Sequence, residues 1–251
     1  MVKIIVSGIN GRMGKAIEEM CKSGDKFQIV AGVDINLGVP HPFPVVSDIN
    51  DIDTSADAII DFSHHTAAKS ISDYAVKNKI PVIFCTTGYT EEELDTIKQA
   101  SKKVAVFRSG NMSLGINLLI ELSKKAAEIL DGFDIEIIEQ HHNQKLDAPS
   151  GTALMIADGI KTVKTDSEYV YDRTQVRKKR ESTEIGIHSV RGGSIVGEHE
   201  VLFAGRNENI TLRHSALSRE VFADGALKAA EFIKGKGAGF YNMSDVLSDL
   251  F

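Results

Sequence analysis

The sequence predicts an α/β protein: a doubly wound parallel sheet followed by a smaller α+β domain with an open mixed sheet. Two observations favour the parallel sheet. Short apolar runs alternate with helical patterns through the first 112 residues, and a glycine-rich turn joins the first run to the first helix. A third observation favours the second sheet, because the chain becomes rich in strand patterns after residue 130.

The composition is that of an ordinary globular protein. The chain has 251 residues, of which 42% are hydrophobic and 25% charged, and such a balance argues against disorder. The net charge of −6 argues against nucleic acid as a partner, since phosphate binding needs an excess of lysine and arginine. Cys21 and Cys85 lack metal-ligand spacing and indicate two reduced thiols. No apolar stretch approaches about 18 residues. We therefore expect a cytoplasmic protein without a membrane partner.

The first strand and the turn after it carry the pattern of a dinucleotide-binding, or Rossmann, unit. Residues 3–7 form a buried type of strand, and the turn Gly8-Ile-Asn-Gly11-Arg-Met-Gly14 leads into a helix. The first glycine sits one place earlier than in the usual fingerprint. A second apolar run, residues 27–33, ends in Asp34, an acid placed to accept hydrogen bonds from the ribose hydroxyls of an adenosine.

The rest of the first domain continues the alternation of strands and helices. We predict strands at residues 58–62, 81–84 and 104–107, and helices at 66–76 and after a capping box formed by Thr90 and Glu93. Ligands of such sheets bind beyond the carboxyl ends of the strands. Phe62, residues 86–88 and residues 109–112 all fall at such ends.

The second part of the chain begins with a long helix at residues 114–130. We predict strands at 133–138, continuing toward His141, and at 184–190, 194–205 and 209–215, in a sheet exposed on one face. The polar segment 161–183 carries the basic run 177–180 and is interpreted as a solvated loop, with an arm between subunits as the alternative. The last predicted helix covers residues 219–233.

The segment from Glu139 to Leu154 is the most informative part of the sequence. It places two adjacent histidines, a lysine, and then Pro-Ser-Gly-Thr between a strand and a helix expected to start near Ala153. Proline suits the entry to a helix, and the N–H groups of Gly151 and Thr152 would form an anion site at its N-terminus. An imidazole, an ammonium group and such a site indicate binding of a small acidic molecule that gains or loses protons.

This segment also resembles a known family. The pattern Glu-x-His-His-x-x-Lys-x-Asp-Ala-Pro-Ser-Gly-Thr-Ala, from Glu139 to Ala153, is similar to the signature of dihydrodipicolinate reductases of lysine biosynthesis. Residues 8–14, 109–112, 190–193, 197–200 and 222–226 match the same family. The chain departs from the family at Cys85, where relatives have glycine, but keeps Thr86 and Thr87.

The resemblance implies roles for individual residues. His141 would be the general acid/base, Lys145 a second acid, and His142 a substrate contact, while Ser150, Gly151 and Thr152 would hold a substrate carboxylate. We expect Asp147 to orient its own loop, and we leave the roles of Arg191 and Arg219 open. The expected cofactor-binding residues are Gly8, Ile9, Asn10, Gly11, Arg12, Met13, Asp34, Cys85, Thr86, Thr87, Ser109, Gly110, Asn111 and Met112.

The resemblance further implies reduction of 4-hydroxy-tetrahydrodipicolinate to tetrahydrodipicolinate, with hydride addition at substrate C4. It implies a discontinuous dinucleotide-binding domain, 1–112 with 220–251, a substrate and oligomerisation domain, 113–219, and a homotetramer formed through the second sheet. We expect both NADH and NADPH to work, with a modest preference for NADH. Asp34 would repel a 2′-phosphate, Ile35 stands where some relatives have arginine, and only Arg12 and Lys15 are nearby cations.

Two other classes of function stay open at this point. A metal-dependent hydrolase could use His141, His142, His188, His199 and His214, although no zinc-binding spacing of histidine or cysteine is present. A non-catalytic dinucleotide sensor would need the glycine turn but neither His141 nor Lys145.

Overall fold

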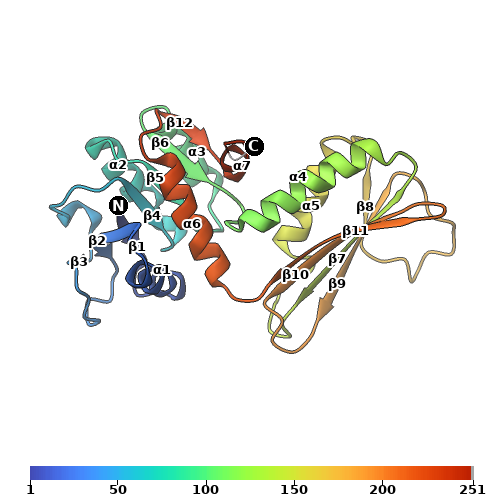
Figure 1. Cartoon of the computed structure of the whole chain (residues 1–251), viewed down its shortest axis with the longest axis horizontal. Helices are drawn as coiled ribbons and strands as arrows, with labels where there is room; N and C mark the ends of the chain where they lie inside the picture. The colour runs from blue at the N-terminus through green and yellow to red at the C-terminus, as the bar shows by residue number, and fades with distance from the viewer. Residues whose placement is uncertain (250–251) are drawn as a thin grey trace. The chain divides into compact units, whose positions relative to one another are not determined.

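The computed structural model describes residues 1–249, and the chain divides into two compact units (Figure 1). One unit contains Met1–Ser113 together with the chain from Glu220 onward, and the other contains Leu114–Arg219. No helix in residues 1–249 has the length and apolar character needed to cross a membrane.

The first unit is built on a seven-stranded sheet in the order β12-β6-β5-β4-β1-β2-β3, and every strand pair in it is parallel. The predicted doubly wound parallel sheet is therefore confirmed. Its order reverses at β1, which lies between β2 and β4. The strands are β1 (Val2–Ser7), β2 (Phe27–Val33), β3 (Val45–Val46), β4 (Ala58–Asp61), β5 (Val82–Phe84), β6 (Ala105–Arg108) and β12 (Gly239–Tyr241).

The strands are continuous apolar runs because helices cover both faces of this sheet. Ile4, Ile5 and Val6 of β1 are all fully buried. One face packs against α2 (Ala68–Asn78) and α3 (Glu91–Ser101), and the other meets α1 (Arg12–Ser23) and α6 (Glu220–Ile233), as Figure 1 shows. Two short 3-10 helices, η1 (Ile49–Asp51) and η2 (His65–Ala67), complete the connections.

The capping box predicted for α3 is confirmed. The Thr90 hydroxyl accepts a hydrogen bond from the Glu93 N–H at 3.3 Å, and the Thr90 N–H donates to the Glu93 carboxylate at 2.8 Å. The end of the chain differs from the expectation, because α6 is not the last helix. The tail adds β12 to the edge of the sheet beside β6 and then forms α7 (Met243–Ser248), which has its own capping box from Asn242 and Asp245.

The second unit contains a five-stranded mixed sheet in the order β11-β10-β7-β9-β8. Pairs β10–β11 and β10–β7 are antiparallel, whereas β7–β9 and β8–β9 are parallel, so the predicted open mixed sheet is confirmed. The strands are β7 (Asp134–His141), β8 (Glu168–Val170), β9 (Glu184–Arg191), β10 (Gly197–Ala204) and β11 (Asn209–Ala216).

Within the described residues, helices cover one face of this second sheet and leave the other without a helix. Alternate residues of β7 and β10, including Ile135, Ile137, Val201 and Phe203, form a core with α4 (Leu114–Ile129) and α5 (Gly151–Lys161). Figure 1 shows both helices along the same side of the strands. The residues between these positions lie on the opposite face, where they are exposed or partly buried.

The interpretation of residues 161–183 as a wholly solvated loop is wrong in two respects. The segment contains β8, which pairs with β9, and its Arg180 side chain is fixed at the end of the sheet. The Arg180 guanidinium donates to the Glu136 carboxylate at 3.0 Å, to Asp134 at 2.8 Å and to the Ile135 carbonyl at 2.9 Å. The local sequence could not predict either feature, because β8 has only three residues and Arg180 binds backbone that is distant in the sequence.

Candidate active site

The glycine turn of the first unit lies close to the neighbouring chain. Gly8 has a φ of 78°, a left-handed conformation that side chains disfavour, and a Cβ atom there would lie 2.7 Å from the Phe62 carbonyl oxygen. Only glycine fits at this position. The turn after β1 can therefore pack against the turn after β4 and leave its backbone open to a ligand.

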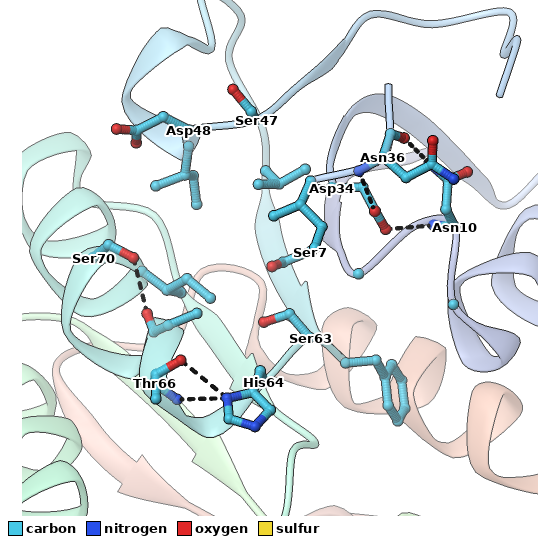
Figure 2. Close-up of a pocket in the computed structure, with 18 residues that line it drawn as sticks. Ser7, Asn10, Asp34, Asn36, Ser47, Asp48, Ser63, His64, Thr66 and Ser70 are labelled. Atoms are coloured by element: carbon cyan, nitrogen blue, oxygen red, sulfur yellow. Dashed lines mark hydrogen bonds between the residues drawn. The ribbon is translucent and has the colours of Figure 1, made fainter. Parts of the chain in front are cut away.

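A cavity of about 760 Å³ opens where the sheet order reverses, at the carboxyl ends of β1, β2 and β4 (Figure 2). This is the place and size at which a doubly wound sheet binds a nucleotide. Its lining comes from the glycine turn, the end of β2, the start of η1 and the turn leading to α2: Ser7, Gly8, Asn10, Gly11, Val33, Asp34, Ile35, Asn36, Ser47, Asp48, Ile49, Phe62, Ser63, His64, Thr66, Ala67, Ser70 and Ile71.

The Asp34 carboxylate is held rigidly at this cavity. One oxygen accepts a hydrogen bond from the Asn10 N–H and the other from the Asn36 N–H, both at 2.9 Å (Figure 2). The Asn10 side chain donates to the Asn36 carbonyl at 2.6 Å, and its oxygen lies 2.9 Å from His41 Nε2. The loop after β2 and the glycine turn thus fix each other. Asp48 adds a second carboxylate, and no lysine or arginine is among the described residues that line the cavity.

Only some of the predicted cofactor residues line this cavity: Gly8, Asn10, Gly11 and Asp34. The Ile9 side chain is fully buried beside Gly32, so only its backbone is available to a ligand. Arg12 and Met13 begin α1. Cys85, Thr86 and Thr87 follow β5, and Ser109, Gly110, Asn111 and Met112 follow β6, all at the carboxyl edge of the sheet. Burial raises the pKa of the Cys85 thiol, which disfavours the nucleophilic thiolate.

A buried polar cluster lies at the carboxyl end of β7 in the second unit. The Glu139 side chain is fully buried, and its carboxylate lies 2.6 Å from His141 Nδ1. The Arg191 guanidinium donates to both carboxylate oxygens at 2.7 and 2.8 Å, and the Ser150 N–H donates at 3.0 Å. Burial alone would raise the pKa of Glu139, but the bonds from His141 and Arg191 outweigh it and hold the pKa well below its usual value.

The two adjacent histidines differ in environment because β7 ends at His141. His141 shares the buried face of the strand with Glu139, whereas His142 is partly exposed in the following turn. His141 Nε2 points away from Glu139 toward Gly197, where an added Cβ atom would lie 3.1 Å from that nitrogen. A side chain at residue 197 would displace the imidazole.

The loop between His142 and Ser150 is braced by two contacts. Lys145 Nζ forms an ion pair with Asp147 at 2.7 Å, and this bond lowers the pKa of the Asp147 carboxyl. Arg191 also donates to the Asp147 carbonyl oxygen at 2.6 Å. Arg191, whose role the sequence left open, therefore holds both the Glu139 carboxylate and the loop that carries Lys145.

Helix α5 begins at Gly151, two residues earlier than expected, with Ser150 as its N-cap. The Ser150 hydroxyl accepts a hydrogen bond from the Ala153 N–H at 3.1 Å. Pro149 lies just before the cap rather than in the first turn. A Cβ atom at Gly151 would meet no protein atom within 4 Å, so the helix start is open at this residue. The N-terminus of a helix favours an anion there.

Three members of this cluster were missed or left open by the sequence analysis: Glu139, Arg191 and His199. His199 on β10 is buried, and its Nε2 lies 3.0 Å from the Ser150 hydroxyl. Its ring meets the His141 ring edge to face, with the centroids 5.2 Å apart. Strand alternation could have found Glu139, because residues two apart share a face. The position of His199 could be predicted only from the register of β10 against β7, which sets it opposite Glu139.

The five histidines of the metal-site alternative do not converge. His141 and His199 share the covered face of the second sheet, but His188 is exposed on the other face, 2.7 Å from Glu136. Within residues 1–249, no three histidine, cysteine, aspartate or glutamate side chains are arranged to hold a metal ion.

Comparison with known proteins gives one consistent family. The model "Dihydrodipicolinate reductase, N-terminus" matches residues 2–112, and "Dihydrodipicolinate reductase, C-terminus" matches residues 115–247. The 4-hydroxy-tetrahydrodipicolinate reductases of Caldanaerobacter subterraneus subsp. tengcongensis and Clostridium novyi are 55% and 50% identical to the chain, each over 98% of both sequences.

Solved structures agree with the sequence comparison. A dipicolinate-bound dihydrodipicolinate reductase from Paenisporosarcina sp. TG-14 superposes with a TM-score of 0.81 at 25% identity, covering 96% of this chain and 97% of that one. A probable dehydrogenase from Thermotoga maritima, at 14% identity and a TM-score of 0.63, covers 99% of this chain and 93% of its own and shares the fold.

Proposed function

The chain belongs to the dihydrodipicolinate reductase family of pyridine-nucleotide-dependent oxidoreductases, and from this premise we propose that it reduces 4-hydroxy-tetrahydrodipicolinate to tetrahydrodipicolinate in lysine and diaminopimelate biosynthesis. The observation that carries the proposal is the buried Glu139–His141 pair beside the N-terminus of α5. It combines a positioned proton donor with an anion-binding helix end, as reduction of a cyclic dicarboxylate requires.

The first unit fits a nicotinamide dinucleotide, because Gly8 keeps the backbone of the first turn accessible and Asp34 presents a fixed carboxylate to a ribose diol. When bound, the reduced dinucleotide supplies the hydride that is added at C4 of the substrate ring. Gly8, Asn10, Gly11 and Asp34 would hold its adenosine and phosphate portions, and residues 85–87 and 109–112 would approach the rest.

The second unit supplies the substrate-binding groups. Ser150, Gly151 and Thr152 at the start of α5 would hold one substrate carboxylate, in keeping with the dipicolinate bound to the Paenisporosarcina relative. His142 would contact the ring. The Lys145 ammonium, which forms an ion pair with Asp147, would attract the second carboxylate.

Proton transfer belongs to His141, assisted by Lys145. Glu139 accepts the Nδ1–H of His141, so that Nε2 is the nitrogen free to exchange a proton with the substrate. Hydride addition at C4 moves an electron pair onto the ring, and protonation of the resulting enamine completes the reduction. In the hydrated substrate, water is lost before this addition: the C4 hydroxyl takes a proton and leaves as water, and the adjacent ring carbon gives up a proton, so the elimination is redox-neutral.

We propose that NADH and NADPH both serve, with NADH modestly preferred. Asp34 and Asp48 put two carboxylates at the cavity and no lysine or arginine lines it within the described chain. A 2′-phosphate would meet like charge there. Arg12 at the start of α1 is the cation nearest in sequence to the glycine turn.

We propose a homotetramer assembled through the helix-free face of the second sheet. Val190, 45% exposed, and the partly buried Ile138 and Leu202 lie on this face, where a second copy of the chain would cover them. Light scattering at several protein concentrations tests the assembly.

The free thiols of Cys21 and Cys85 support a cytoplasmic location.

A direct assay separates this function from a non-catalytic sensor. Substrate generated in situ is added to the protein with NADH, and oxidation of the cofactor is followed against the His141→Gln variant. Turnover by the native protein that the variant loses supports the reductase. Cofactor binding without oxidation would support the sensor instead.

A further inference from the structure

Ser150 and His199 form a buried hydrogen-bonded pair in the second unit. The Ser150 hydroxyl lies 3.0 Å from His199 Nε2, and both side chains are buried, with 2% and 3% of their surfaces exposed. The same hydroxyl accepts from the Ala153 N–H at 3.1 Å. The other ring nitrogen, Nδ1, is buried and has no partner in the described chain.

The positions of the protons follow from the cost of burying unpaired groups. A serine hydroxyl has two lone pairs and one proton, and the Ala153 N–H occupies one lone pair. If the hydroxyl donated to His199, the imidazole proton would sit on Nδ1 as a buried donor without an acceptor. If instead Nε2–H donates to the hydroxyl, Nδ1 is only an unused acceptor, which costs less than an unpaired donor. The second arrangement is therefore favoured.

His199 is neutral in this environment, as the second arrangement needs. Burial and the nearby His141 lower the pKa of His199 from 6.5 to about 3. A neutral imidazole has one proton, and its tautomer is fixed by the better of its two possible partners.

We infer that His199 is a positioning residue that donates its Nε2–H to the Ser150 hydroxyl and so directs the serine proton toward the substrate carboxylate. Both lone pairs of the serine are then occupied, and its O–H is left to donate to the substrate carboxylate. The inference rests on the proposed function and deepens it. His199 would act on substrate affinity through Ser150 and would leave the cofactor site unchanged.

The test uses two matched replacements of His199 in the full chain. The glutamine amide nitrogen of His199→Gln reaches the place of Nε2, whereas the asparagine amide of His199→Asn reaches only the place of Nδ1. We expect His199→Asn to weaken dipicolinate binding and to raise the substrate KM about tenfold, the size of one lost hydrogen bond to a charged group. We expect His199→Gln to restore most of the affinity, and the NADH KM to stay unchanged in both. If His199→Asn does not fold, His199→Phe keeps the ring and removes the donor.

A double-mutant cycle shows whether His199 acts through Ser150. The double variant Ser150→Ala, His199→Asn should bind dipicolinate no more weakly than Ser150→Ala alone. Additive losses, equal losses in the glutamine and asparagine variants, or native affinity in His199→Asn would each overturn the inference while native turnover persists. Absence of turnover by the native protein would instead overturn the proposed function.

Discussion

His141 Nδ1 lies 2.6 Å from a carboxylate oxygen of Glu139, on the covered face of a strand that ends at His141 itself. Arg191 binds the same carboxylate through both of its oxygens. Because the carboxylate binds Nδ1, the imidazole is held with Nε2 directed away from Glu139, toward Gly197. The arrangement requires only the alternation of β7 and one arginine from the neighbouring β9.

Replacement of His141 and Lys145, the two proton donors that we propose, should affect the reaction differently. His141→Gln should lower kcat much more than it raises KM, because proton transfer is a transition-state role. Lys145→Ala should impair both, since we also propose that Lys145 binds a substrate carboxylate. The expected loss is about 10²–10⁴-fold in either variant, measured by steady-state kinetics. Lys164→Ala, which removes a lysine paired with Asp131 at 3.0 Å in the same unit, is the matched control and should keep native rates. Near-native turnover of both donor variants, with native circular dichroism, would refute the assigned mechanism.

Gly151 offers a test of the carboxylate site. Gly151→Val should abolish substrate and dipicolinate binding while dinucleotide binding and thermal stability stay native. The reason is that a Cβ atom there lies in open space, apart from its chain neighbours and the helix backbone, so the new side chain would extend into the proposed carboxylate site. Calorimetric titration with each ligand makes the measurement. Equal loss of both ligands would show that the residue has been assigned to the wrong site.

Acid stability should depend on His199. Its folded pKa of about 3 lies below the ordinary 6.5, so between these values the unfolded chain binds a proton that the folded chain does not. Stability is therefore lost as pH falls from 6.5 toward 3, with a slope approaching about 1.4 kcal/mol per pH unit. His141, Glu139, His214 and Lys145 all contribute to the field at His199. The pKa of the Glu139 carboxyl is also lowered in the folded protein, so protonation of Glu139 removes further stability as the pH falls below about 4.5. Urea unfolding of His199→Gln should show a shallower decline between pH 6.5 and 5 than the native protein. An identical decline would contradict the assignment.

Substitutions at Asp34 and Ile35 should change the preference for NADH over NADPH. Asp34→Ala should narrow or invert the preference for NADH, because it removes both the diol contact and the repulsion of a 2′-phosphate. It also frees the N–H groups of Asn10 and Asn36, so the KM for both cofactors should rise. Ile35→Arg is the gentler variant, since Ile35 lines the cavity and is 94% exposed. It should raise kcat/KM for NADPH about tenfold through a charge-assisted bond. A strong native preference for NADPH would show that Arg12 or another cation outweighs Asp34.

The strands and turns that the sequence predicted correctly are those in which the local residue pattern agrees with burial in the fold. Residues 2–7 and 27–33 are apolar because both faces of their strands are covered, and the turn at Gly8 has a steric requirement that only glycine meets. The pairing of Glu139 with His141 was also within reach, because residues two apart on a strand share a face.

Other features depend on contacts that no local pattern encodes. Strand β12 has only three residues, and it forms because they pair with the free edge of β6. His199 joins the site only through the register that sets it opposite Glu139. The two hydrogen bonds that fix the Asp34 carboxylate form because the loop after β2 folds back on Asn10. His41, in the same loop, contacts the side-chain oxygen of Asn10. Tertiary pairing, rather than propensity, decides these three features.

Transfer of labelled hydride tests the central claim most directly. The protein is given NADH deuterated at the transferable position of nicotinamide C4, together with 4-hydroxy-tetrahydrodipicolinate, and the product is analysed by NMR and mass spectrometry. We expect one deuterium at C4 of tetrahydrodipicolinate and stoichiometric oxidation of the cofactor. Deuterium at another carbon, or no oxidation by a folded protein that binds both ligands, would contradict it.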